Sequence, residues 1–126
     1  MIDFFLTAHA WWQYVVLLAI VVSLVYAFRS PMMDPTAETV YRVTAVLVDI
    51  QVTLGIIVWL SESGWSLGFM QGWLHPILGV AAAGALHGSV SAARKAHPEV
   101  ANRNIRRGLI VVVVLVVAAI GIAEMA

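Results

Sequence analysis

The chain has 126 residues, of which 62% are hydrophobic and 11% are charged, with seven basic and seven acidic side chains. Soluble domains carry about 25% charged residues, so this composition excludes a soluble fold, and its hydrophobicity excludes intrinsic disorder. The balanced charge predicts no nucleic-acid partner. Because the chain has no cysteine, disulfides, thiolate metal sites and iron–sulfur clusters are excluded. We therefore predict a small integral membrane protein embedded in a lipid bilayer.

Four stretches of the sequence are apolar and long enough to cross a bilayer as helices, which takes about 20 residues each. They run from about 4 to 28, 40 to 60, 74 to 93 and 105 to 122. All four are apolar on every face and lack the alternation of a membrane β-barrel. We expect an all-α fold, an integral membrane four-helix bundle, with residues 1–126 forming a single transmembrane domain.

The basic residues orient this bundle, because Lys and Arg concentrate in loops that stay in the cytoplasm. All of them lie at the first and third connections, which four spans place on one side: Arg29, Arg42, Arg94, Lys95, Arg103, Arg106 and Arg107. We expect these loops to be cytoplasmic in a plasma (inner) membrane, with the N-terminus and the C-terminus both on the outer side. An interfacial aromatic belt is expected at the outer edge from Trp11, Trp12, Trp59, Trp65 and Trp73.

Two of the four histidines begin spans that cross the membrane in the same direction. His9 opens the first span and His75 opens the third, so both imidazoles are expected at one depth near the outer face. Two neutral imidazoles from facing helices can serve as the axial ligands of haem iron. We predict one haem b with His9 and His75 as its metal ligands, although both histidines also fit plain interfacial anchors.

The neighbours of these histidines suit a flat macrocycle. The segment GVAAAGALHG is rich in small residues, which let a porphyrin or a neighbouring helix approach closely. Pro76 places His75 at a helix start or on a kink. The face of the second span that carries Gln51 and Gly55 is expected to point toward the third helix or the cofactor. The cofactor-binding residues predicted beside the histidines are Gln13, Gln51, Gly55 and Gly79.

Two further polar residues are expected inside the membrane. Asp49 lies near the middle of the second span, and His87 lies at a similar depth in the third. A buried carboxylate at that depth costs about 2.5 kcal/mol or more, so we predict a hydrogen bond between Asp49 and His87. The pair would be a structural clasp or, alternatively, a proton relay. His97 in the basic loop is expected to be solvated.

The order of these features resembles one four-helix half of the haem A synthase family. The segments concerned are HAWWQYVVLLAIVVSLVYAF, QVTLGIIVWL and LHPILGVAAAGALH, which together cover roughly residues 9 to 87. The resemblance implies that His9 and His75 are axial ligands of a b-type haem. The Glu-x-x-His-Arg pattern of that family is missing, because Leu6 and Ala10 occupy the Glu and Arg positions. The resemblance therefore implies haem binding without haem oxidation.

Three functions follow from these expectations. The first is a small membrane b-type cytochrome for electron transfer or haem holding, rather than an enzyme, with a quinone or a redox protein as partner at the outer face. The alternatives are a compact haem A synthase-like haem-modifying enzyme and a haem-free accessory subunit of a respiratory or transport complex. A homodimer or a larger membrane complex is compatible with each function.

Overall fold

The computed structural model describes residues 2–29 and 35–124, and these residues form four long helices with no strand among them. The helices are α1 (Ile2–Arg29), α2 (Pro35–Ser61), α3 (His75–Lys95) and α4 (Pro98–Glu124). Two short helical turns, η1 (Gly64–Ser66) and η2 (Met70–Leu74), connect α2 to α3. All four long helices are apolar and long enough to cross a membrane, which confirms the predicted four-helix architecture.

The helices extend beyond the predicted spans, most clearly at their polar ends. α2 begins at Pro35 and α4 begins at Pro98, positions where a proline is favoured because the first turn of a helix needs no backbone N–H. The hydroxyl of Thr39 donates to the carbonyl of Pro35 at 2.9 Å and tightens the first turn of α2. The hydropathy of the sequence marks only the apolar section of each helix, whereas these helices continue into the polar residues that flank it.

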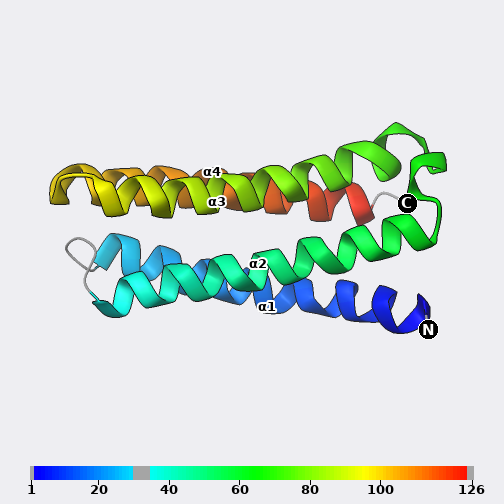
Figure 1. Ribbon diagram of the computed structural model, residues 1–126, viewed down its shortest axis with the longest axis horizontal. Helices are drawn as coiled ribbons and strands as arrows, with labels where there is room; N and C mark the ends of the chain where they lie inside the picture. The colour runs from blue at the N-terminus through cyan, green and yellow to red at the C-terminus, as the bar shows by residue number, and fades with distance from the viewer. Residues whose placement is uncertain (1, 30–34, 125–126) are drawn as a thin grey trace.

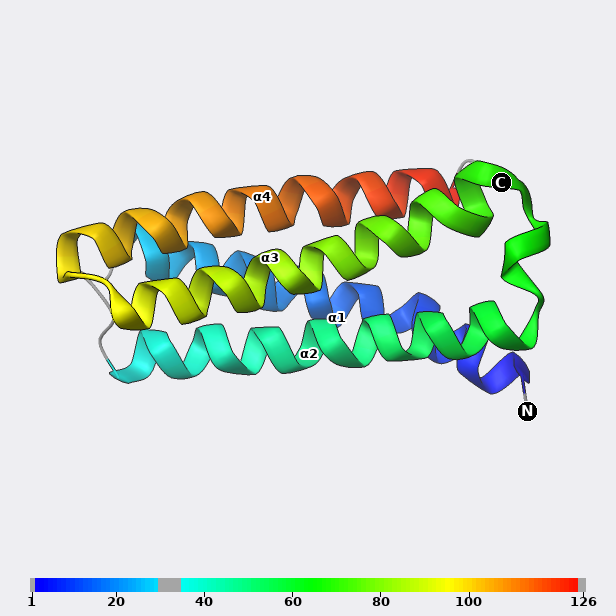
Figure 2. The ribbon, with the colours of Figure 1, turned by 45° about the horizontal axis from the view of Figure 1, so that its top comes forward.

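The bundle consists of two helix pairs, α1 with α2 and α3 with α4, which pack together along their lengths (Figures 1 and 2). The start of α1 and the end of α4 lie at the same end as the α2–α3 connection (Figure 1). The α3–α4 connection lies at the opposite end, which we call the basic end because Arg94, Lys95 and the arginines at the start of α4 lie there.

The buried side chains are concentrated in the half of the bundle toward the basic end. Among the described side chains, burial in α1 begins only at Val16, and burial in α2 ends at Val48. In α3 it begins at Ala82. The opposite half, which holds the starts of α1 and α3, contributes to the core mainly through Ala119 and Ile122 of α4. One half of the bundle is therefore close-packed, and the other is more open.

Polar contacts hold the close-packed half together. The Ser23 and Thr44 hydroxyls lie 2.8 Å apart in a hydrogen bond that joins α1 to α2, and the Thr44 hydroxyl also lies 2.8 Å from the Val40 carbonyl. At the basic end, Arg106 of α4 donates from Nε to the Ala27 carbonyl at 2.9 Å. An ion pair between Arg94 and Glu38 (3.1 Å) joins α3 to α2.

A close contact between α3 and α4, at Gly108 and Ser89, gives a test of this packing. A Cβ atom at Gly108 would overlap the side chain of Ser89, so we expect Gly108→Ala to lower the free energy of unfolding by about 1–3 kcal/mol. In a Ser89→Gly background the same change should have little effect, because the overlapping atoms are gone. The free energy of unfolding of the four proteins, wild type, each single variant and the double variant, is measured by SDS titration followed by circular dichroism. An equal decrease in the free energy of unfolding in both backgrounds would contradict the close contact between Gly108 and Ser89.

Candidate functional site

The imidazole rings of His9 on α1 and His75 on α3 lie side by side in the open half of the bundle. Their centroids are 6.1 Å apart, and the ring planes are inclined by 84°. The prediction that two helices running in the same direction bring these histidines to one depth is confirmed. Both side chains are partly buried, so the rings face each other inside the bundle.

The backbone before His75 departs from a regular α-helix, and Pro76 is the physical reason. Proline has no N–H to offer the carbonyl four residues earlier, which here belongs to Gly72. The indole Nε1 of Trp59 donates to that carbonyl instead, at 2.6 Å. The residues before His75 form the π-helical turn η2, and the His75 N–H bonds to the carbonyl of Met70. The prediction that His75 lies at a helix start or on a kink is confirmed, because α3 begins at His75 directly after this π-helical turn.

A backbone carbonyl of α4 holds the His75 ring and sets the position of its proton. His75 Nδ1 lies 2.8 Å from the carbonyl oxygen of Ala119. A carbonyl only accepts hydrogen bonds, so Nδ1 carries the hydrogen, and in the neutral ring the lone pair is on Nε2. This arrangement is typical of histidines that bind a metal through Nε2. Gln71, four residues before His75, donates to the carbonyl of Ile122, which is also on α4.

The His9 ring packs against the backbone of α2 at Gly55. A Cβ atom at this position would lie 2.9 Å from His9 Cε1, so a glycine is needed for the ring to fit. Among the described residues, the buried His9 Nδ1 makes no hydrogen bond of standard geometry, and the same holds for Oε1 of Gln51, whose side chain lies next to the His9 ring. Buried polar atoms without such a bond are rare in folded proteins, and here two of them lie beside the histidine pair.

The other predicted site residues lie in different surroundings. Gly55 faces His9 on α1, and not the third helix. Gly79 packs toward α2, where an added Cβ would lie 3.9 Å from Val52. Gln13 is partly buried and makes no hydrogen bond within the described part of the chain. Later in the segment GVAAAGALHG, two glycines are exposed, and an added Cβ atom at either would meet no described atom within 4 Å: Gly84 and Gly88.

Three tryptophans form a cluster beside the site, over the α2–α3 connection. Trp59 makes edge-to-face contacts with Trp65 and Trp73, at centroid distances of 5.3 and 5.5 Å. The expectation that Trp12 belongs to an interfacial belt is wrong. Its indole donates to the Leu47 carbonyl at 2.9 Å and packs on the core. The amide-like N–H of an indole can satisfy a buried acceptor as well as anchor at an interface.

The functional parts that sequence reasoning missed are backbone groups and their partners. The Ala119 carbonyl orients His75 but belongs to a residue type without polar character, so no pattern in the sequence indicates it. The role of Trp59 had a detectable signal, because Pro76 leaves the Gly72 carbonyl in need of a donor.

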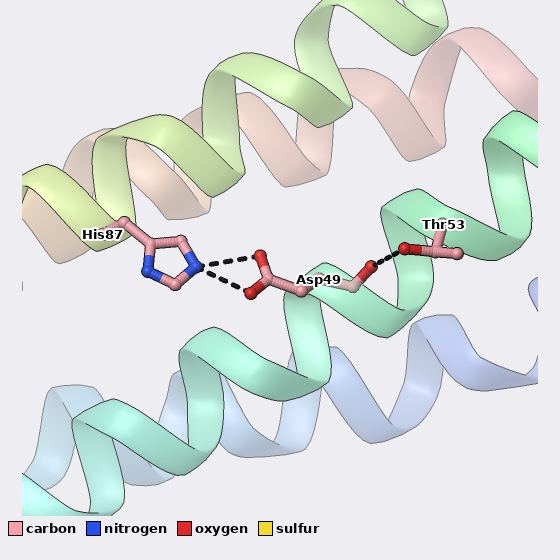
Figure 3. A network of polar contacts seen from close by, with 3 residues as sticks. All are labelled: Asp49, Thr53 and His87. Carbon is pink, nitrogen blue, oxygen red and sulfur yellow. Dashed lines mark hydrogen bonds and ion pairs between the residues drawn. The ribbon is translucent and has the colours of Figure 1, made fainter.

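The predicted hydrogen bond between Asp49 and His87 is confirmed. His87 Nε2 lies 2.9 and 2.8 Å from the two carboxylate oxygens of Asp49, and Thr53 donates to the Asp49 backbone carbonyl (Figure 3). The expectation that Asp49 is buried is wrong. The Asp49 and His87 side chains are 45% and 53% exposed, because the pair bridges α2 and α3 on the outside of the bundle.

No protein-family model, curated protein or solved structure matches this chain. The resemblance to a haem A synthase half stays a prediction from the sequence.

The proton position on His75 can be measured directly. In the neutral state we expect the ¹⁵N spectrum of histidine-labelled protein in nanodiscs to show His75 protonated on Nδ1, because the Ala119 carbonyl holds that hydrogen. A His75→Gln variant assigns the signal, and the exposed His97 should show the Nε2-protonated form that predominates in free histidine. A neutral His75 protonated on Nε2 would contradict the hydrogen bond to Ala119.

Proposed function

We propose that this chain is a small membrane cytochrome that binds one b-type haem through His9 and His75 and serves in electron transfer. The observation that carries the proposal is the 6.1 Å separation of the two rings. Imidazole nitrogens bind metals at about 2 Å, so two rings on opposite sides of one metal have centroids about 6 Å apart. The separation in this bundle suits a metal shared between the rings.

The chemistry of the donor set favours haem over a bare metal ion. Among the described residues, no cluster of three or more His, Asp or Glu side chains could hold a metal. Zinc sites use three or four protein ligands, so two histidines alone would leave such a site incomplete. Haem iron receives four bonds from the porphyrin and needs only axial ligands from the protein. Two histidines are then a complete set.

The packing of the bundle also supports a prosthetic group in this half. The core residues lie toward the basic end, whereas the residues around the two histidines are only partly buried. In the part of the chain that the structure describes, the buried Nδ1 of His9 and Oε1 of Gln51 make no hydrogen bond of standard geometry. A group placed between α1 and α3 would fill this half of the bundle, as cofactors do in other four-helix bundles.

The residues around the two histidines would each contribute to haem binding. Bound haem would supply one-electron chemistry by cycling between ferric and ferrous iron. The Ala119 carbonyl fixes the His75 ring with its Nε2 lone pair free, and Gly55 provides the space for the His9 ring. The cluster of Trp59, Trp65 and Trp73 covers the nearby connection and limits the access of water.

The charge distribution sets the direction in the membrane. We infer that the basic end faces the cytoplasm of a plasma membrane, so the histidine pair and both termini lie toward the outer face. The redox partner, a quinone or a redox protein, would then meet the chain at that face. Leu6 and Ala10 provide no acid–base group, so haem oxidation is not included in the proposal.

The visible spectrum tests the two ligands. Protein purified from haem-replete cells should show a sharp Soret band and resolved α and β bands on reduction with dithionite. His9→Ala and His75→Ala should each abolish the low-spin spectrum, because each removes one axial ligand, whereas His97→Ala should leave it unchanged. A colourless wild-type protein would favour a haem-free accessory subunit. Loss of the spectrum in His87→Ala would show that the ligand assignment is wrong.

The contact between Gly55 and His9 tests the geometry separately. We expect Gly55→Ala to broaden or shift the low-spin spectrum and to lower haem occupancy several-fold, because the new methyl group displaces the His9 ring. Gly121→Ala is the matched control, since a Cβ atom there meets no other atom within 4 Å. Haem occupancy of the purified variants is measured by the pyridine haemochrome assay. Identical occupancy in the two variants would contradict the role of Gly55.

A further inference from the structure

The Asp49–His87 pair lies on the exterior of the bundle, far from either end of α2. Asp49 is near the middle of α2 (Pro35–Ser61), roughly 20 Å from each end of the helix at 1.5 Å per residue. About half of each side chain is exposed. Ionisable residues at this depth almost always face protein or a water-filled cavity. In a single copy of the chain this pair would face acyl chains, so the surface needs a protein cover.

The adjacent face of α3 has the small residues that allow a close approach by another helix. Gly84 and Gly88 are exposed, and a Cβ atom at either would meet nothing within 4 Å. Their spacing is the Gly-x-x-x-Gly arrangement found where transmembrane helices cross closely. Ser91 and Ala92 continue the exposed small face toward the basic end. The glycines and the polar pair are independent features of one surface.

A hollow beside the glycines extends this surface toward α4. It has a volume of about 450 Å³, and small residues provide much of its lining, among them Ala85, Gly88, Ala92 and Gly108. No large side chain of α3 occupies it, so side chains of an adjoining helix could enter. The surface is thus recessed on one side of Gly88 and polar on the other.

We propose that the chain forms a two-fold symmetric homodimer in which α3 crosses α3 of a second copy at Gly84 and Gly88. Self-complementarity selects a second copy as the occupant, because a two-fold contact brings the same patch of both copies together. Each patch offers the Asp49 carboxylate as an acceptor and, when the His87 ring is protonated, Nδ1–H as a donor, since Nε2 already donates to Asp49 and Nδ1 makes no hydrogen bond among the described residues. The dimer covers both polar pairs, and it does not depend on haem binding.

Single-cysteine cross-linking tests the contact, because the chain has no cysteine of its own. We expect Ser91→Cys, on the proposed interface, to form disulfide-linked dimers in liposomes treated with copper phenanthroline. Leu18→Cys is the control, since Leu18 is 66% exposed on α1 and lies outside the interface. The yield for Ser91→Cys should exceed that for Leu18→Cys at least five-fold at a low protein-to-lipid ratio. Equal yields, or none, would overturn the proposal.

A second measurement separates loss of the dimer from loss of the fold. Förster transfer between labelled copies in liposomes should show at least ten-fold weaker association for Gly84→Leu, because the larger side chain keeps the helices apart. Gly121→Leu, at an exposed glycine on α4, should associate like the wild type. Circular dichroism must show equal helicity in both variants. A wild-type chain that remains monomeric at every protein-to-lipid ratio would overturn the proposal. The surface around Gly84 and Gly88 would then face lipid or a different membrane protein.

Discussion

Inside a bilayer no water completes the hydrogen bonds of the backbone, so each carbonyl and N–H must find its partner within the protein. Helices meet most of this requirement, and the exceptions determine much of the structure. The Gly72 carbonyl, which Pro76 leaves without a donor, receives the indole of Trp59. Near the opposite end, the carbonyl of Ala27 receives Arg106. The turns and side chains that result position His75 at the start of its helix.

The two halves of the bundle differ in how closely their side chains pack. Toward the basic end, close packing and the contact between Ser23 and Thr44 join the helices. Toward the other end, polar side chains face inward and the packing is looser. A group bound between α1 and α3 would stabilise the open half in proportion to its affinity, since a ligand that binds only the folded state favours that state.

The two pairs of ionisable residues differ because of their angle around the helix axes. His9 and His75 point into the bundle, where backbone groups hold one ring and a glycine accommodates the other. Asp49 and His87 point outward and satisfy each other across α2 and α3. The rings of the first pair lie partly buried inside the bundle. The second pair lies about half exposed on its outside, so the histidines of this small protein occupy two different environments.

The level of each residue along the bundle could be predicted from the sequence alone. A helix rises by a constant amount per residue, so counting residues along four apolar spans was enough to bring His9 level with His75, and Asp49 level with His87. The same hydropathy pattern established the number of helices, and Pro76 indicated the start of α3. These features depend on length and composition, which every apolar helix displays in its sequence.

Rotation about the helix axes was decided only by the tertiary structure. Helices that are apolar on all sides carry little amphipathic pattern to show which face meets a neighbour. The sequence therefore did not indicate that Trp12 turns inward, that Gly84 and Gly88 turn outward, or that the Asp49–His87 pair lies outside the bundle. The contact of the Ala119 carbonyl with His75 could not be predicted from the sequence either, because a backbone acceptor is present in every residue type. Packing of the four helices against one another determines these orientations.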